Sequence, residues 1–184
     1  MPSKVERTRD RLLAVALELF VEQGYDATSA GQIAARAGVT EMTFFRHFPT
    51  KASLLIGDPY DPLIGAAIRD QAASLDPISR AAQGIRSAWQ QLPAPASTEV
   101  RTRLRIVAQT PSLRAAMTSG TAATEAVIVE ALVDGGTGQR EAAIAASAVM
   151  AALNTALLEW SLADDEELGQ AINTALNVLA DRRG

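Results

Sequence analysis

The chain has 184 residues, with 17 Lys and Arg against 21 Asp and Glu, a single histidine and no cysteine. This composition excludes disulfides, thiolate metal sites, thiol nucleophiles and any metal site built on two histidines. The 36 alanines, set against 12 glycines, 8 prolines and 4% aromatic residues, predict an all-α fold of nine or ten helices.

The first eleven residues are charged rather than apolar, so they do not resemble a signal peptide. The basic groups from Lys4 to Arg11 fit either a solvated helix face or an arm that reaches DNA phosphates. Residues 142–158 are apolar, but their length and alanine content favour a buried bundle helix over a membrane span. We therefore expect a cytoplasmic protein with no membrane partner.

The first expected helix ends at Gly24, a residue that accepts the backbone conformation found after a helix. Its apolar residues recur on one helical face: Leu12, Ala16, Leu19 and Phe20. A short second helix opens at Ser29, which forms a capping-box spacing with Gln32, and closes at Gly38. Thr40 caps a third helix that must finish before Pro49.

The remaining helices are delimited by Pro, Gly and capping residues. Asp61 and Asp76 each precede a proline, which is the favoured opening of a helix. The stretch Pro93-Ala94-Pro95 is expected to be a loop, and the glycine-rich stretch 134–138 separates two long helices. The expected helices run from 50, then over about 62–74, 77–92, 97–110, 112–133, 139–161 and 165–182, the last opened by the acidic run 164–167.

Residues 28–51, TSAGQIAARAGVTEMTFFRHFPTK, predict a helix-turn-helix, the motif that places its second helix in the major groove of DNA. Ala34 is small enough for two helices to cross closely, and Gly38 accepts the turn. The first two turns of the second helix leave five side chains facing outward, where they would meet base edges: Thr40, Glu41, Met42, Thr43 and Arg46. The Glu41 carboxylate would accept a hydrogen bond from the amino group of cytosine, and Met42 and the Thr43 methyl would contact the methyl group of thymine.

Residues 7–55 resemble the N-terminal domain of the TetR family of bacterial repressors. The resemblance rests on Leu19-Phe20, Gly24-Tyr25, Ala27-Thr28-Ser29, Ile33-Ala34, Ala37-Gly38-Val39-Thr40, Thr43, Phe44-Phe45, His47-Phe48, Lys51 and Leu54-Leu55. It implies a homodimer that binds a near-palindromic double-stranded DNA operator and is released by a small-molecule effector. It also implies a DNA-binding domain over residues 1–52 and a ligand-binding and dimerisation domain over 53–184.

The same resemblance assigns phosphate contacts to His47, Lys51 and the region of Ser29. Lys51 is also expected at a helix N-terminus, which favours a phosphate. Phe45 stands where the family most often has a tyrosine whose hydroxyl contacts phosphate, so Phe45 lacks that donor. Gly31 stands where a longer polar residue is common, so a backbone contact is missing there as well.

The C-terminal part carries no catalytic pattern, and His47 lacks a neighbouring carboxylate or nucleophile, so we expect neither an enzyme nor a cofactor. Residues 58–63 and the alanine-rich bundle with Trp160 resemble an actinobacterial TetR branch related to the mycofactocin-associated regulator, which is associated with acyl-coenzyme-A-like ligands. The candidate effector-binding residues are Arg86, Trp89, Arg105 and Asn154, each of which could equally be structural.

Arg101, Arg103 and Arg105 form a basic cluster in which Arg101 and Arg105 share one helical face. This cluster is expected either to be a solvated helix face or to bind the phosphates of a nucleotide-like ligand. The dimer is expected to form through residues 139–182, on a face made of Ala142, Ala145, Ala146, Val149, Ala152 and Leu153. The alternative function is a helical small-molecule-binding protein or enzyme whose helix-turn-helix corner is only structural.

Overall fold

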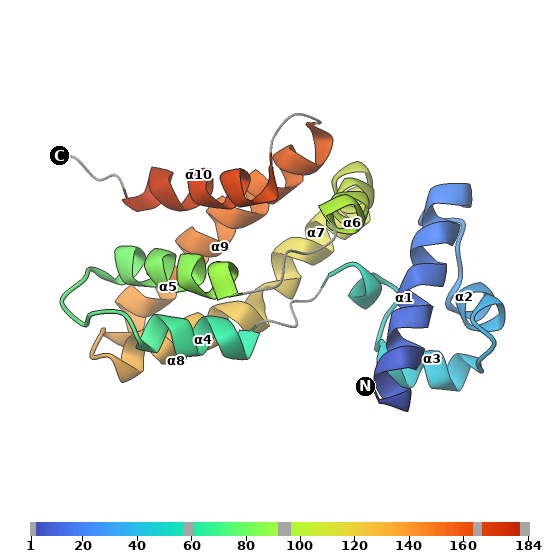
Figure 1. The fold of residues 1–184 in the computed structure, drawn as a ribbon, viewed down its shortest axis with the longest axis horizontal. Coiled ribbons are helices and arrows are strands. Elements are labelled where there is room, and N and C mark those ends of the chain that lie inside the picture. Colours follow the sequence, from blue (N-terminus) through green and yellow to red (C-terminus); the bar gives the residue numbers. More distant parts are fainter. Residues whose placement is uncertain (1–2, 57–60, 92–96, 164–166, 181–184) are drawn as a thin grey trace.

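The computed structural model describes residues 3–56, 61–91, 97–163 and 167–180 (Figure 1). These residues form α-helices and one 3-10 helix, with no strand among them, which confirms the all-α prediction. The α-helices are α1 (Lys4–Gln23), α2 (Ala30–Arg36), α3 (Glu41–His47), α4 (Asp61–Arg69), α5 (Pro77–Gln91), α6 (Ser97–Gln109), α7 (Pro111–Gly120), α8 (Ala122–Asp134), α9 (Gln139–Leu162) and α10 (Leu168–Ala180). Figure 1 shows α1 to α3 grouped at one end of the molecule, beside a bundle formed by the later helices.

The N-terminal helices begin at the residues that the sequence predicts. The hydroxyl of Ser29 accepts the backbone N–H of Gln32 at 3.1 Å, and the Gln32 side chain accepts the Ser29 N–H at 2.8 Å. Thr40 caps α3 by accepting the N–H of Thr43 at 3.2 Å. Gly24 and Gly38 have φ angles of 88° and 68°, which explains why glycine ends α1 and forms the turn before α3.

A first hydrophobic core lies beneath α1, α2 and α3. Its buried residues include Leu12, Ala16, Leu19, Phe20, Ile33, Ala34, Phe44 and Phe48. Val107 of α6 and Leu113 of α7 belong to the same core, and both are almost fully buried. The N-terminal domain therefore shares a core with helices of the C-terminal part, and α1 contacts α6.

A second core is enclosed by α4, α5, α8, α9 and α10, with the side chain of Trp160 buried at one end of α9. The helices approach closely because small residues lie between them. At Gly84 of α5, a Cβ atom would lie 2.5 to 2.8 Å from the side chain and backbone of Ile68 in α4.

Several expected boundaries are wrong. The helix expected from residue 50 is only the 3-10 helix Ala52–Leu54, and α4 ends at Arg69 instead of near residue 74. The expected helix over 112–133 is divided into α7 and α8, because Gly120 and Thr121 have low helix propensity and Gly120 lies against Ile56. Most of the acidic run 164–167 lies outside the described residues, so its role at the last helix stays a prediction.

The alanine-rich face of α9 is not the exposed dimer face that the sequence suggested. Ala142, Ala145, Ala146, Val149 and Leu153 are at most 8% exposed, because they pack against other helices of the same chain. α9 is long and apolar enough to cross a membrane by length and composition. In the fold it is the central helix of the bundle, in contact with α5, α6, α8 and α10.

Candidate nucleic-acid interface

The outer face of α3 is formed by side chains that the packing of Phe44 turns away from the core. Phe44 is fully buried, whereas Glu41, Met42, Phe45 and Arg46 are exposed. Met42 is 83% exposed and Phe45 is 46% exposed, which is unusual for residues of this size and polarity. The helix-turn-helix thus presents an outward surface at the place that the sequence predicts.

Two residues expected to read bases have their polar groups directed to other parts of the motif. The hydroxyl of Thr43 is half-buried and lies 3.0 Å from the hydroxyl of Thr40. The carboxylate of Glu41 lies over Gly31 of α2, where a Cβ atom would be 3.6 Å from its Oε2 atom. A Cβ atom at residue 31 would therefore meet the Glu41 carboxylate at ordinary van der Waals distance.

Lys51 is held inside the domain. Its ammonium donates to the backbone carbonyl oxygens of Tyr25 at 2.7 Å and Thr28 at 2.8 Å. It also lies 3.9 Å from the centre of the Tyr25 ring, in a cation–π contact. Burial lowers the pKa of Lys51, and the carboxylate of Asp26 partly opposes that shift. The sequence analysis missed this structural role, because the partners lie more than twenty residues away.

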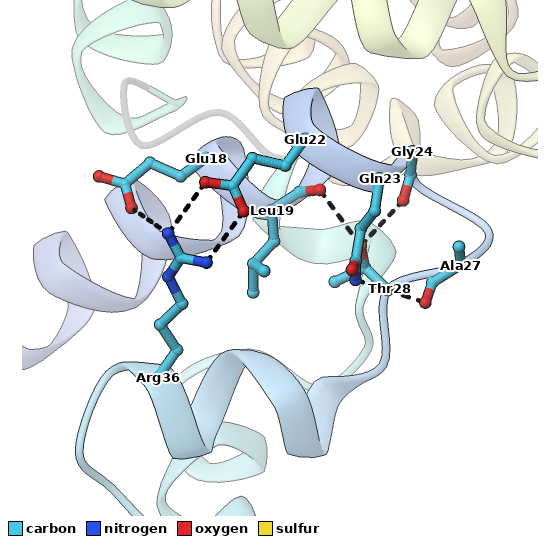
Figure 2. A network of polar contacts seen from close by, with 8 residues as sticks. All are labelled: Glu18, Leu19, Glu22, Gln23, Gly24, Ala27, Thr28 and Arg36. Atoms are coloured by element: carbon cyan, nitrogen blue, oxygen red, sulfur yellow. Dashed lines mark hydrogen bonds and ion pairs between the residues drawn. The ribbon is translucent and has the colours of Figure 1, made fainter.

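A polar network fixes the segment that leads from α1 into α2 (Figure 2). The buried hydroxyl of Thr28 donates to the carbonyl oxygen of Gly24 at 2.8 Å, and the Gln23 amide donates to that hydroxyl at 3.1 Å. In Figure 2, Arg36 reaches from α2 to α1, where it forms two hydrogen bonds of 2.9 Å with Glu22. The helix that precedes the turn is therefore tied to α1 at both ends.

The basic residues near the start of the chain lie on a helix and not on an extended arm. α1 begins at Lys4, and Ser3 and Glu6 cap it through a reciprocal capping box. The guanidinium of Arg9 lies 4.7 Å from the centre of the Phe48 ring, and it donates to the carbonyl oxygen of His47 at 3.5 Å. Arg9 thus links the start of α1 to the end of α3, beside the half-buried His47.

The four candidate effector-binding residues lie on three helices, α5, α6 and α9. Arg86 of α5 donates to the side chains of Asn173 and Asn177 in α10, at 3.0 and 2.9 Å. Trp89 is half-buried and packs against the second core. Asn154 is half-buried on α9, and Arg105 contacts the far end of that helix. Arg86 and Arg105 thus have partners within the chain.

The three arginines of α6 are half-buried and bound to backbone carbonyl groups, so they are not a solvated face. Arg101 donates to the carbonyl oxygens of Trp160 and Ala163, and Arg105 donates to that of Ser161 at 2.9 Å. Arg103 faces the other way, as predicted, and donates to the carbonyl oxygen of Leu55 at 3.3 Å.

A shallow groove lies between α1 and α6, with a volume of about 480 Å³. It is lined by Asp10, Leu13, Ala14 and Leu17 of α1 and by Glu99 of α6. The groove is at the junction of the N-terminal domain and the bundle, and none of the four predicted effector residues lines it. It could not be predicted from the sequence, because α1 and α6 are distant in the chain.

Comparison with known proteins agrees with this architecture. Residues 12–56 match the family described as "Bacterial regulatory proteins, tetR family", and residues 75–184 match the "MftR C-terminal domain". The chain belongs to the TetR family. Its N-terminal part is a TetR-type helix-turn-helix domain, and its C-terminal part has the helical fold of that family.

Named relatives match less than half of this chain. The regulator TcmR of Streptomyces glaucescens is 37% identical over 86 residues, which are 46% of this chain and 38% of TcmR. The regulator AcrR of Shigella flexneri is 45% identical over 51 residues, 28% of this chain and 24% of AcrR. The chain thus matches well under two thirds of the length of these relatives, which are named as transcriptional regulators.

Solved TetR-family structures match over the whole length. NalD of Pseudomonas aeruginosa, the secondary repressor of the MexAB-OprM multidrug efflux pump, is 26% identical with a TM-score of 0.52, over 93% of this chain and 94% of NalD. The fatty acid degradation regulator FadR of Bacillus halodurans is 16% identical with a TM-score of 0.57, over 100% and 98% of the two chains. The second likeness concerns the fold alone.

Proposed function

We propose that this TetR-family regulator is a repressor that binds a near-palindromic operator as a homodimer in the cytoplasm and is released by a small effector. The observation that carries the proposal is the outward face of α3, which is exposed and rigidly supported at the tip of the N-terminal domain. Residues 1–52 would bind DNA, and residues 53–184 would bind the effector and the second subunit.

Phosphate contacts would surround the outward face of α3 and position it in the major groove. Ser29 is exposed at the start of α2, and His47 lies at the end of α3. Lys51 uses two of its three donors inside the domain, which leaves one N–H for a phosphate oxygen. Thr40 and Arg46 complete the proposed DNA-binding set.

The proposed dimer uses the face of α9 opposite to its buried alanines. Ile144, Ala148, Ala151, Thr155 and Leu162 fall on one side of the helix at coiled-coil spacing. Ile144 is 62% exposed and Leu162 is 51% exposed, so an apolar stripe remains unpartnered in the single chain. Val178, on the neighbouring α10, is a further exposed apolar residue, at 74%.

The effector is proposed to be apolar or acyl-coenzyme-A-like, in keeping with the match to the MftR C-terminal domain. Two proteins of the same fold were solved with small molecules: SmeT with triclosan, and Thermus thermophilus FadR with lauroyl-CoA. The alternative is a small-molecule-binding helical protein or enzyme that keeps the helix-turn-helix corner for packing only.

The test is the binding of a labelled duplex from the region upstream of the chain's own operon, measured by fluorescence anisotropy at several salt concentrations. A specific complex should bind at least a thousandfold more tightly than a scrambled duplex, with an affinity that falls steeply with salt, on the order of protein–DNA complexes generally. Addition of long-chain acyl-coenzyme A should then release the duplex. Equal affinity for both duplexes would favour the alternative function.

A further inference from the structure

The outermost side chains of α3 are apolar. In a helix, residues three and four positions apart lie on one face, so Met42 lies between Phe45 and Arg46 on the side opposite to Phe44. Seven large hydrophobic residues are exposed in the described part of the chain, and two of them, Met42 and Phe45, are neighbours on this short helix. The surface that the motif offers to DNA is thus an apolar pair flanked by the exposed charges of Glu41 and Arg46.

The ring of Phe45 is held in a defined orientation. It meets the ring of Phe44 in an edge-to-face contact, with centroids 5.2 Å apart and planes at 86°. Phe44 itself is fully buried and also contacts Phe48, with centroids 5.9 Å apart. A ring supported in this way loses little conformational freedom when it contacts a ligand.

The Thr43 hydroxyl next to this pair is bound within the protein, 3.0 Å from the hydroxyl of Thr40. The exposed carboxylate of Glu41 lies beside the pair, close to Gly31 of α2. Phe45 has no hydroxyl with which to bind a phosphate. The exposed parts of Met42 and Phe45 themselves are therefore apolar.

The major groove displays one apolar group, the C5-methyl of thymine. We propose that Met42 and Phe45 determine operator specificity by contacting thymine methyl groups, so that each half-site carries thymine at the positions beneath these two side chains. This inference rests on the proposed DNA-binding function. It assigns the base reading to Met42 and Phe45 instead of Glu41 and Thr43.

Replacement of thymine by deoxyuridine tests the proposal, because it removes the methyl group and leaves base pairing unchanged. The operator is first recovered by selection from a random duplex pool, and each thymine of one half-site is then replaced in turn. Wild-type protein should lose roughly fourfold in affinity at each contacted position, the factor expected for one buried methylene-sized group. A loss that arises from contact with Met42 should be absent in Met42→Ala, and a loss that arises from contact with Phe45 should be absent in Phe45→Ala.

Phe45→Leu serves as a second variant that preserves an apolar side chain, and circular dichroism checks that each variant folds. Val21→Ala, at an exposed apolar residue of α1, is the matched control and should keep the wild-type pattern. Specific binding that is insensitive to every thymine-to-deoxyuridine replacement would overturn the inference while leaving the proposed function intact. Failure to select any preferred sequence would overturn both.

Discussion

The ammonium group of Lys51 lies 2.7 Å from the carbonyl oxygen of Tyr25 and 3.9 Å from the centre of the same residue's ring. The ammonium group also donates a hydrogen bond to the carbonyl oxygen of Thr28, so it binds the segment between α1 and α2 at two points. That segment ends at Ser29, the cap of α2. The position of the helix-turn-helix therefore depends on a side chain that follows it in the sequence.

Replacing Lys51 by methionine should lower the free energy of unfolding by about 1–3 kcal/mol, since two carbonyl groups lose a charged donor. Chemical denaturation measures this change, and Lys4→Met, at an exposed residue of α1, is the control that should leave stability unaltered. If the remaining N–H of Lys51 also binds a phosphate, the salt dependence of DNA binding should fall by about one charge per subunit. Unchanged stability would contradict the structural role.

Replacing Thr28 by valine should destabilise the protein by about 1–2 kcal/mol, because the change keeps the shape and removes the hydroxyl. The Gly24 carbonyl would lose its donor, and the Gln23 amide would lose its acceptor. Thr28→Ser keeps the hydroxyl and should retain those hydrogen bonds. Thermal unfolding distinguishes the two variants, and equal loss in both would show that the methyl group matters more than the network.

Replacing Ile144 by glutamate should prevent dimer formation by placing a charge in the proposed apolar interface. Sedimentation velocity should show a dimer for the wild type and a monomer for the variant at micromolar concentration. Glu141→Gln, at an exposed residue one turn earlier in α9, should remain dimeric. A wild-type protein that sediments as a stable monomer would refute the proposed dimer.

Tyr25 should ionise at a higher pH than an ordinary tyrosine. Its pKa is raised above 10.0, first by burial and then by the carboxylate of Asp26. Because the unfolded chain ionises first, the contribution of Tyr25 to stability is complete below about pH 10 and is lost as the pH rises through the folded pKa. Ultraviolet titration of phenolate in Tyr60→Phe, which leaves Tyr25 as the sole tyrosine, measures this pKa, and Asp26→Asn should lower it.

Local signals in the sequence predicted the N-terminal domain well. Ser29, Thr40 and Asp76 cap helices as expected, since a cap and its N–H partner are only three residues apart. Gly24 and Gly38 take the positive φ angles that their places in the chain predict. The TetR assignment follows from the same stretch.

Features that depend on distant partners were less predictable. The alanines of α9 were recognised as a close-packing face, but the pattern could not say that the partner was the same chain. Lys51 stood at a position typical of a phosphate contact, and its bonds to Tyr25 and Thr28 arise only when the loop folds back. The proximity of the Glu41 carboxylate to Gly31 likewise depends on the angle between α2 and α3.

The opposite orientations of Arg103 and its neighbours on α6 have a geometric consequence for the proposed dimer. Arg101 and Arg105 hold the end of α9, which would lie beside the two-fold axis, while Arg103 holds Leu55 at the edge of the DNA-binding domain. In the proposed dimer, α6 would thus connect the region of the two-fold axis to each DNA-binding domain. Insertion of one base pair between the two half-sites would require α6 of both subunits to tilt, which would break these hydrogen bonds.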